Sequence, residues 1–221
     1  VVPVMYMGLI LPILVTAWSA KKISTFKQTL QEAFDFFSIL AIPLVFGTIA
    51  LGTPVMKLIA GEAFAESGRV LAILGPAASI VFFGALFGHA IVGVNKQKPM
   101  TLGYALVAAI TIAGYVLFIP EYGIWAAAWW TLIAEILITI ITFIVVWRTS
   151  SFLPKMDMVF KALFSSIIMY IAIILLPELH ALILVTIGSL IYFVALSALG
   201  GPKLKDAKAL FLPEKPPIAQ P

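Results

Sequence analysis

The sequence contains no cysteine and very little charge. Without cysteine the chain can form neither a disulfide nor a thiolate metal site. Its two histidines, His89 and His180, lie too far apart in the sequence to suggest a metal cluster, so we expect neither a metal nor a cofactor. Charged residues make up 11% of the chain and hydrophobic residues 62%, whereas soluble domains are about a quarter charged. A water-soluble fold of 221 residues could not bury this much apolar surface, so the expected solvent is lipid.

Seven apolar segments follow one another along the chain, and each is long enough to cross the hydrocarbon core of a bilayer as a helix of about 20 residues. They predict an all-α integral membrane bundle occupying residues 1–200, followed by a disordered cytoplasmic tail over 201–221. The predicted spans are residues 1–20, 33–51, 69–94, 100–119, 124–147, 158–176 and 181–199.

Two features near the second span refine this prediction. The basic stretch 21–31 is expected to begin the second helix as an amphipathic segment. Gly52-Thr53-Pro54 is expected to end that helix, since proline removes a backbone hydrogen bond and clashes with the preceding turn. A separate short interfacial helix is then predicted over 55–60.

Twelve of the fourteen Lys and Arg residues lie in every second gap between the apolar segments or in the tail. The positive-inside rule therefore predicts a multi-pass protein of the cell membrane, with its first residue outside and its C-terminus in the cytoplasm. The net charge of +4 is explained by lysines facing an anionic leaflet, so it does not indicate a nucleic-acid partner. Because seven spans place the two ends on opposite sides, we expect an upstream part with an odd number of spans.

Three prolines, Pro12, Pro43 and Pro76, lie within predicted spans and are expected to kink their helices. One interpretation is that neighbouring helices satisfy the freed carbonyls and the prolines are simply tolerated. The other is that the bends serve alternating access in a transporter.

Glu135 lies near the middle of the fifth segment and hence near the bilayer midplane. A carboxylate there is costly unless it faces the bundle interior, is paired or is protonated. Glu135 is therefore a candidate for substrate contact or for coupling to a proton or cation. The alternative is a structural carboxyl hydrogen-bonded to another helix through Thr131 or Thr139, each one turn away.

Three further polar residues are candidates for substrate or ion coupling. His89 lies close to the cytoplasmic end of the third segment, where a satisfied packing histidine is the alternative. Lys57 and Arg69 are the only cations in the outer gaps, where they could meet an anionic head group or could snorkel to the interface. The sequence shows no catalytic constellation and no phosphate-binding loop, so we do not expect an enzyme.

An ordered series of motifs resembles the C-terminal half of polysaccharide exporters of the multidrug/oligosaccharidyl-lipid/polysaccharide (MOP) superfamily. The outer segment LIAGEAFAESGRVLAIL precedes a long helix ending in AIVGVNKQKP, and a further helix leads into FIPEYGIWAAAWWTLIAEIL. In this family a helix typically ends in Ile-Pro-x-Tyr-Gly, and the next contains small residues, Thr and often Glu. The matching positions are Ile119, Pro120, Tyr122, Gly123, Ala127, Thr131 and Glu135.

The resemblance implies a fourteen-helix MATE-like transporter, of which this chain would supply helices eight to fourteen. It implies export of a polyprenyl-diphosphate-linked glycan from the cytoplasmic to the outer leaflet by alternating access. The expected partners are that glycan, membrane lipids and the missing N-terminal lobe of the same protein.

Three other functions remain open from the sequence. A multidrug or organic-cation antiporter and a peptidoglycan-precursor flippase belong to the same superfamily, and their distinguishing charges would lie in the first lobe. An integral-membrane enzyme of glycan assembly is a further alternative, but the short outer loops do not favour it.

Overall fold

The computed structural model describes residues 2–176 and 179–201 and contains only helices in that part of the chain. Seven of these helices are long and apolar enough to cross a membrane, so the all-α, multi-pass prediction is confirmed. The long helices are α1 (Val2–Ser19), α2 (Ile23–Ala60), α3 (Ala65–Gly93), α4 (Gln97–Tyr122), α5 (Ile124–Ser150), α6 (Asp157–Leu175) and α7 (Ala181–Ala198), and the short 3-10 helix η1 (Glu62–Phe64) precedes α3. The predicted tail lies outside the described residues, except for Gly201.

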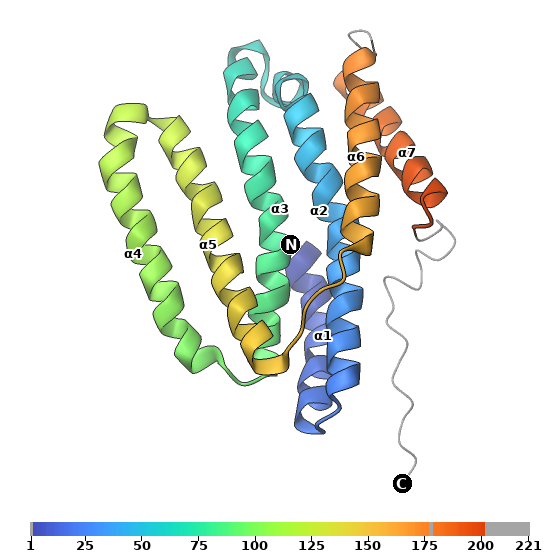
Figure 1. Cartoon of the computed structure of the whole chain (residues 1–221). Coiled ribbons are helices and arrows are strands. Elements are labelled where there is room, and N and C mark those ends of the chain that lie inside the picture. The colour runs from blue at the N-terminus through green and yellow to red at the C-terminus, as the bar shows by residue number, and fades with distance from the viewer. Residues whose placement is uncertain (1, 177–178, 202–221) are drawn as a thin grey trace.

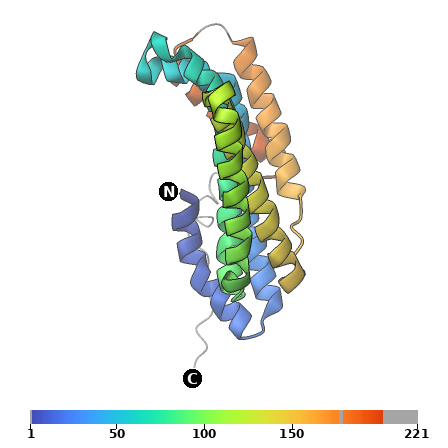
Figure 2. The same cartoon turned by 90° about the vertical axis from the view of Figure 1, so that its left-hand side faces the viewer.

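The two central helices are α2 and α3, which pack against each other along their length (Figure 1). Helix α1 packs on both of them, α5 packs on the other side of α3, and α4 packs on α5 at the edge of the molecule. Helices α6 and α7 form a pair that packs on α2. The view turned by 90° shows α1 and α6 on opposite sides of the bundle (Figure 2).

An aromatic core fills the junction of α1, α2 and α3. Tyr6 of α1 stacks on Phe36 of α2 with ring centroids 4.4 Å apart, and Phe37 meets Phe82 of α3 edge-on at 5.5 Å. Phe37 is fully buried. Because lipid tails are as apolar as these side chains, such close van der Waals packing is what holds membrane helices together.

Helix α2 is a single helix of 38 residues, about 57 Å long and so longer than the hydrocarbon core is thick. The prediction that its basic beginning is helical is confirmed, since α2 starts at Ile23. The predicted break at Gly52-Thr53-Pro54 and the separate helix over 55–60 were wrong. Pro54 removes only one backbone bond near the end of a helix that packs closely on α3, and packing overrides this local signal.

Gly52 does not end α2 but allows it to approach α3 closely. A Cβ atom at Gly52 would lie 2.5 Å from the carbonyl oxygen of Gly68 on α3, and one at Gly68 would overlap the Thr53 backbone. Two turns after Gly68 on α3, a Cβ at Gly75 would overlap the Thr48 side chain of α2. The backbones of α2 and α3 therefore touch at this end of the bundle, as small residues allow in membrane proteins.

Successive helices run in opposite directions, so the gaps that the sequence marked as basic gather at one end of the bundle (Figure 1). That end holds the α1–α2 turn, the α3–α4 turn and the α5–α6 connector, with Lys21, Lys22, Lys96, Lys98 and Lys155. The opposite end holds η1 and the single-residue turn at Gly123, whose φ of 57° suits glycine.

Candidate functional site

A long groove lies between α2 and the α6–α7 pair. Its volume is about 330 Å³, which falls within the range of about 300–1,000 Å³ typical of small-molecule sites. Along α2 it extends from Ile39 to Val55, a length of about 24 Å at the rise of an α-helix. Leu44, Val185 and Phe193 line it and are each partly exposed, so the groove opens to the surface of the bundle. The other lining residues are Leu40, Pro43, Gly47, Thr48, Leu51, Gly52, Leu71, Met169, Ile173, Gly188, Ser189 and Tyr192.

Pro43 and Tyr192 meet at this groove. Proline has no N–H, so Pro43 leaves the carbonyl of Ile39, four residues earlier, without its usual helical partner. The hydroxyl of Tyr192 on α7 donates to that carbonyl at 2.8 Å, and Tyr192 is almost completely buried. Helix α7 thus satisfies the backbone group that the proline in α2 freed.

The remaining hydroxyl groups of the groove are also satisfied within the protein. Thr48 Oγ1 contacts the carbonyl oxygens of Leu44 and Val45 at 2.9 and 3.0 Å, and Ser189 Oγ donates to the carbonyl of Val185 at 2.8 Å. Each lining hydroxyl therefore already has an acceptor, and the groove presents an apolar surface. Such a surface suits hydrocarbon better than a sugar or an ion.

Glu135 lies elsewhere, on the face of α5 that packs against α3. Thr139 and Thr142 follow it at the spacing of one helix face, and a Cβ atom at Gly84 of α3 would lie 3.1 Å from Thr139 Oγ1. Among the described residues, the Glu135 carboxylate makes no hydrogen bond or ion pair, and Thr139 Oγ1 is buried without a partner.

The two threonines considered as partners for Glu135 do not bond to it. Thr131 Oγ1 donates to the carbonyl of Ala127 at 2.8 Å and contacts the hydroxyl of Tyr115 on α4 at 2.9 Å. The hydroxyl of Thr139 has no partner in the part of the chain that the structure describes. The Glu135 carboxylate and the Thr139 hydroxyl, one turn apart near the middle of α5, are therefore two polar groups without a hydrogen-bond partner within the described residues.

His89 has a local partner. Its Nδ1 lies 2.7 Å from the carbonyl oxygen of Ala85, one turn earlier on α3. A carbonyl only accepts, so this contact places the proton on Nδ1. The arrangement is that of a half-buried histidine satisfied by its own helix.

Lys57 and Arg69 do not line the groove either. Lys57 forms an ion pair of 2.9 Å with Glu62 across the turn between α2 and η1, and both side chains are largely exposed. Arg69 is exposed at the beginning of α3, about 30 Å along that helix from His89. No hydrogen bond or ion pair joins any two of Glu135, His89, Lys57 and Arg69 within the described residues.

Two outcomes follow for the residues singled out from the sequence. Pro12, Pro43 and Pro76 each lie within a continuous helix, and Pro43 also lines the groove; the kinks stay a prediction. In the described part of the chain, no group of three or more His, Asp or Glu side chains could hold a metal ion.

Sequence reasoning missed the groove and the role of Tyr192. The sequence does indicate that a hydrogen-bond donor is needed, because Pro43 must leave one backbone carbonyl of its helix without a partner. It does not indicate which of the tyrosines would supply the hydroxyl, since that depends on how α7 packs against α2.

Comparisons with protein-family models, with curated proteins and with solved structures found no match to this chain. The seven helices in the described residues that are long and apolar enough to cross a membrane make the chain a multi-pass membrane protein. The family resemblance rests on the ordered sequence motifs.

Proposed function

We propose that this chain is part of a transporter that flips a polyprenyl-diphosphate-linked oligosaccharide between membrane leaflets. The observation that carries the proposal is the groove between α2 and the α6–α7 pair. It is about 24 Å long, its hydroxyls are satisfied internally, and residues on its rim are exposed where lipid surrounds the bundle. An isoprenoid chain is long, narrow and apolar, so it matches this groove in shape and chemistry.

Transport also needs a source of free energy, and Glu135 is the residue proposed for that role. Within the described residues, its carboxylate and the buried hydroxyl of Thr139 are both without partners. An unpaired carboxyl at this depth is stabilised by binding a proton or a cation. Coupling through Glu135 would equally serve a multidrug or organic-cation antiporter, which is therefore the second candidate.

The basic end of the bundle supports an orientation for this transporter. Lysines gathered at one end favour the cytoplasmic side. The cargo would then enter near the basic turns and leave near η1 and the α4–α5 turn.

The function is tested in proteoliposomes that contain the protein as the cell makes it. A fluorescent polyprenyl-diphosphate oligosaccharide is added, and its movement between leaflets is followed by a membrane-impermeant quencher. Gly47→Trp places a large ring in the groove at a position where a Cβ meets nothing within 4 Å, so we expect flipping to fall about tenfold with folding unchanged. Gly8→Trp, at an equally open glycine on α1 outside the groove, is the matched control.

Equal flipping by the wild type and Gly47→Trp would contradict the groove as the site of the lipid chain. No flipping by the wild type, together with electroneutral exchange of an organic cation for protons, would favour the antiporter. In either transporter Glu135→Gln is expected to abolish coupling to the ion gradient at normal expression. Lost expression of Glu135→Gln would instead show that the carboxyl has a structural role.

A further inference from the structure

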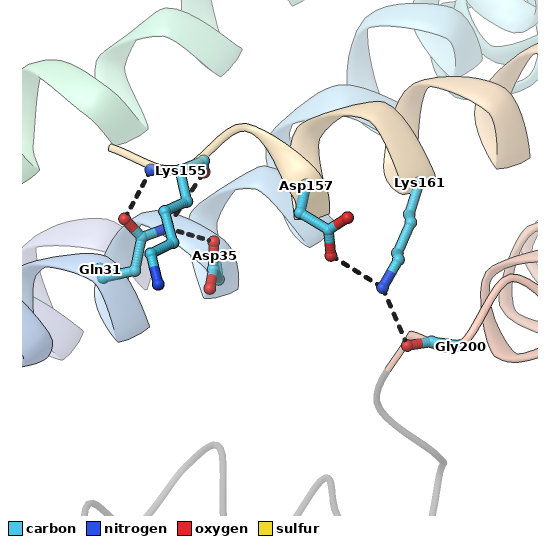
Figure 3. A network of polar contacts seen from close by, with 6 residues as sticks. All are labelled: Gln31, Asp35, Lys155, Asp157, Lys161 and Gly200. Atoms are coloured by element: carbon cyan, nitrogen blue, oxygen red, sulfur yellow. Dashed lines mark hydrogen bonds and ion pairs between the residues drawn. The ribbon is translucent and has the colours of Figure 1, made fainter. Parts of the chain in front are cut away.

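A second cavity lies at the basic end of the bundle, where the α5–α6 connector (residues 151–156) crosses the beginning of α2. Gln31 of α2 holds the connector in place (Figure 3). Its Oε1 accepts the backbone N–H of Lys155 at 2.8 Å, and its Nε2 donates to the Lys155 carbonyl at 3.1 Å and to Asp35 Oδ1 at 2.8 Å. The backbone of Lys155 is therefore fixed against α2.

The cavity has a volume of about 390 Å³ and brings together two lysines from different elements. Lys27 lies one turn before Gln31 on α2, so both face the connector. Lys155 comes from the connector itself. The residues lining the cavity are Lys27, Gln28, Gln31, Ser151, Phe152, Leu153 and Lys155.

Neither lysine forms a direct ion pair within the described residues, although Asp35 lies close enough to Lys155 to interact with it electrostatically. The ion pairs among the described residues are Lys57–Glu62 and Lys161–Asp157. On the same stretch of α2, Glu32 accepts a hydrogen bond from Gln28 at 2.9 Å, and Asp35 accepts one from Gln31. The two lysines thus line a cavity that has no carboxylate in its own lining, which favours an anion between them.

Apolar side chains adjoin this cationic cavity. Phe152 is buried in the aromatic core and anchors the connector, whereas Leu153 is 63% exposed and Met156 47% exposed. A soluble anion would gain no favourable contact from exposed apolar side chains beside its binding site. A phospholipid, with its charged head joined to hydrocarbon, satisfies both the lysines and the exposed leucine and methionine.

We propose that Lys27 and Lys155 bind the phosphate of an anionic phospholipid at the membrane surface. Basic pockets between transmembrane helices at the cytoplasmic surface are suited to such head groups, and each lysine near the surface contributes about a fivefold gain in affinity. The bound lipid would brace the connector and thereby the position of the α6–α7 pair against α2. This site is separate from the apolar groove and does not depend on the proposed transport function.

The test is binding of phosphatidylglycerol to the purified full chain in detergent, measured by native mass spectrometry as the fraction of protein retaining lipid. We expect the double substitution Lys27→Gln and Lys155→Gln to weaken binding about 25-fold. The double substitution Lys96→Gln and Lys98→Gln removes the same charge from the α3–α4 turn at the same end, outside the cavity, and is expected to weaken binding much less because neither side chain lines the site.

Two further measurements test whether the bound phosphate belongs to an anionic lipid and whether the lysine charges are what bind it. Phosphatidylcholine and inorganic phosphate, each offered at the concentration of phosphatidylglycerol, are expected not to compete. Lys27→Arg with Lys155→Arg keeps both charges and is expected to retain binding. The Gln variants keep the backbone groups of residue 155 that Gln31 holds, so their folding is checked by thermal unfolding.

Three results would overturn the proposal. Equal weakening by the control pair would show that only the overall charge matters. Displacement by inorganic phosphate would show a site for a soluble anion. Equal binding of phosphatidylcholine would show that the lysines do not select the head group.

Discussion

The two faces of α2 are packed in contrasting ways. Toward α3, its backbone touches the backbone of the neighbouring helix at Gly52 and Gly68, and aromatic rings pack between the two helices nearer the other end of the contact. Toward α6 and α7, it borders a groove of about 330 Å³, packs through a smaller apolar cluster that includes Ile39 and Met169, and accepts a hydrogen bond from Tyr192. One helix therefore belongs both to a rigid core and to an open, ligand-sized interface.

This difference indicates which part of the bundle can move. Closely packed backbones have no alternative arrangement at similar free energy, whereas a groove between side chains, bridged by the Tyr192 hydrogen bond, can widen or close. We therefore expect α1, α2 and α3 to act as one body, and the α6–α7 pair to shift against it when the groove fills.

The largest effect is expected from adding one methyl group to the rigid face. Gly52→Ala would place a Cβ 2.5 Å from the Gly68 carbonyl oxygen and force α2 and α3 apart. Overpacking of this kind costs about 1–3 kcal/mol or more. The thermal midpoint in detergent should fall, and the folded fraction on size-exclusion chromatography should decrease.

Gly47→Ala is the matched control on the groove side of the same helix, where a Cβ meets nothing within 4 Å. Replacing a helical glycine by alanine there should be neutral or stabilising by up to about 1 kcal/mol. Equal destabilisation by both substitutions would contradict the contrast between the two faces.

A smaller effect is expected from removing the bond across the groove. Tyr192→Phe leaves the carbonyl of Ile39 without its donor and should cost about 0.6–1.7 kcal/mol, the usual range for hydrogen bonds between membrane helices. Tyr170→Phe is the control, because the Tyr170 ring packs edge-on against Phe46 and its hydroxyl makes no hydrogen bond within the described residues.

A double-mutant cycle sharpens this prediction. Pro43→Ala restores an N–H that can bond to the Ile39 carbonyl within α2, so Tyr192→Phe should cost less in that background. The measurement is the difference in unfolding free energy between the two backgrounds. If the free-energy effects of the two substitutions were strictly additive, the Tyr192 hydroxyl would not be replacing the backbone N–H that Pro43 lacks.

A still smaller effect on global stability is expected from Gln31→Leu, which releases the connector from α2. Exposed hydrogen bonds contribute about 0.5–1 kcal/mol or less. The local consequence should be clearer, since the backbone N–H of Lys155 loses its acceptor. Hydrogen exchange should accelerate across residues 151–156 and stay unchanged in the α3–α4 turn; unchanged exchange in the connector would show that Gln31 is not what holds it.

The smallest effect is expected from Lys161→Gln. Lys161 pairs with Asp157 at 2.8 Å and donates to the Gly200 carbonyl at 3.3 Å, which ties α6 to the end of α7 (Figure 3). The Asp157 side chain is 76% exposed, so the pair should contribute about 0.3–0.5 kcal/mol. High salt should remove this difference in thermal midpoint between the variant and the wild type.

The number of spans and their alternation could be predicted from the sequence, because apolar length and loop charge are local properties. The extent of α2 could not, since Gly52 and Pro54 are signals for a break unless another helix packs on them. The groove could not be predicted either, because its walls come from residues as distant as Ile39 and Tyr192.

The candidate residues divide in the same way. Glu135 stood out in the sequence because a carboxylate in an apolar span is rare, and its place on the face of α5 toward α3 follows from helix periodicity. The hydroxyl of its neighbour Thr139, which faces α3, lacks a partner within the described residues, whereas Thr131 bonds to Tyr115 of α4; both outcomes depend on how α5 packs against its neighbours.

The sequence by itself determined that this is a multi-pass membrane protein with seven helices in its described part that are long and apolar enough to span a bilayer, and that most of the lysines between them lie in every second gap. Those properties follow from composition and from the order of segments, which act through the solvent. Only the tertiary structure decided that α2 is rigid on one side and open on the other, and that Tyr192 completes the helix that Pro43 interrupts. Contacts between distant segments fix those properties, because every backbone group in lipid must find its partner within the protein.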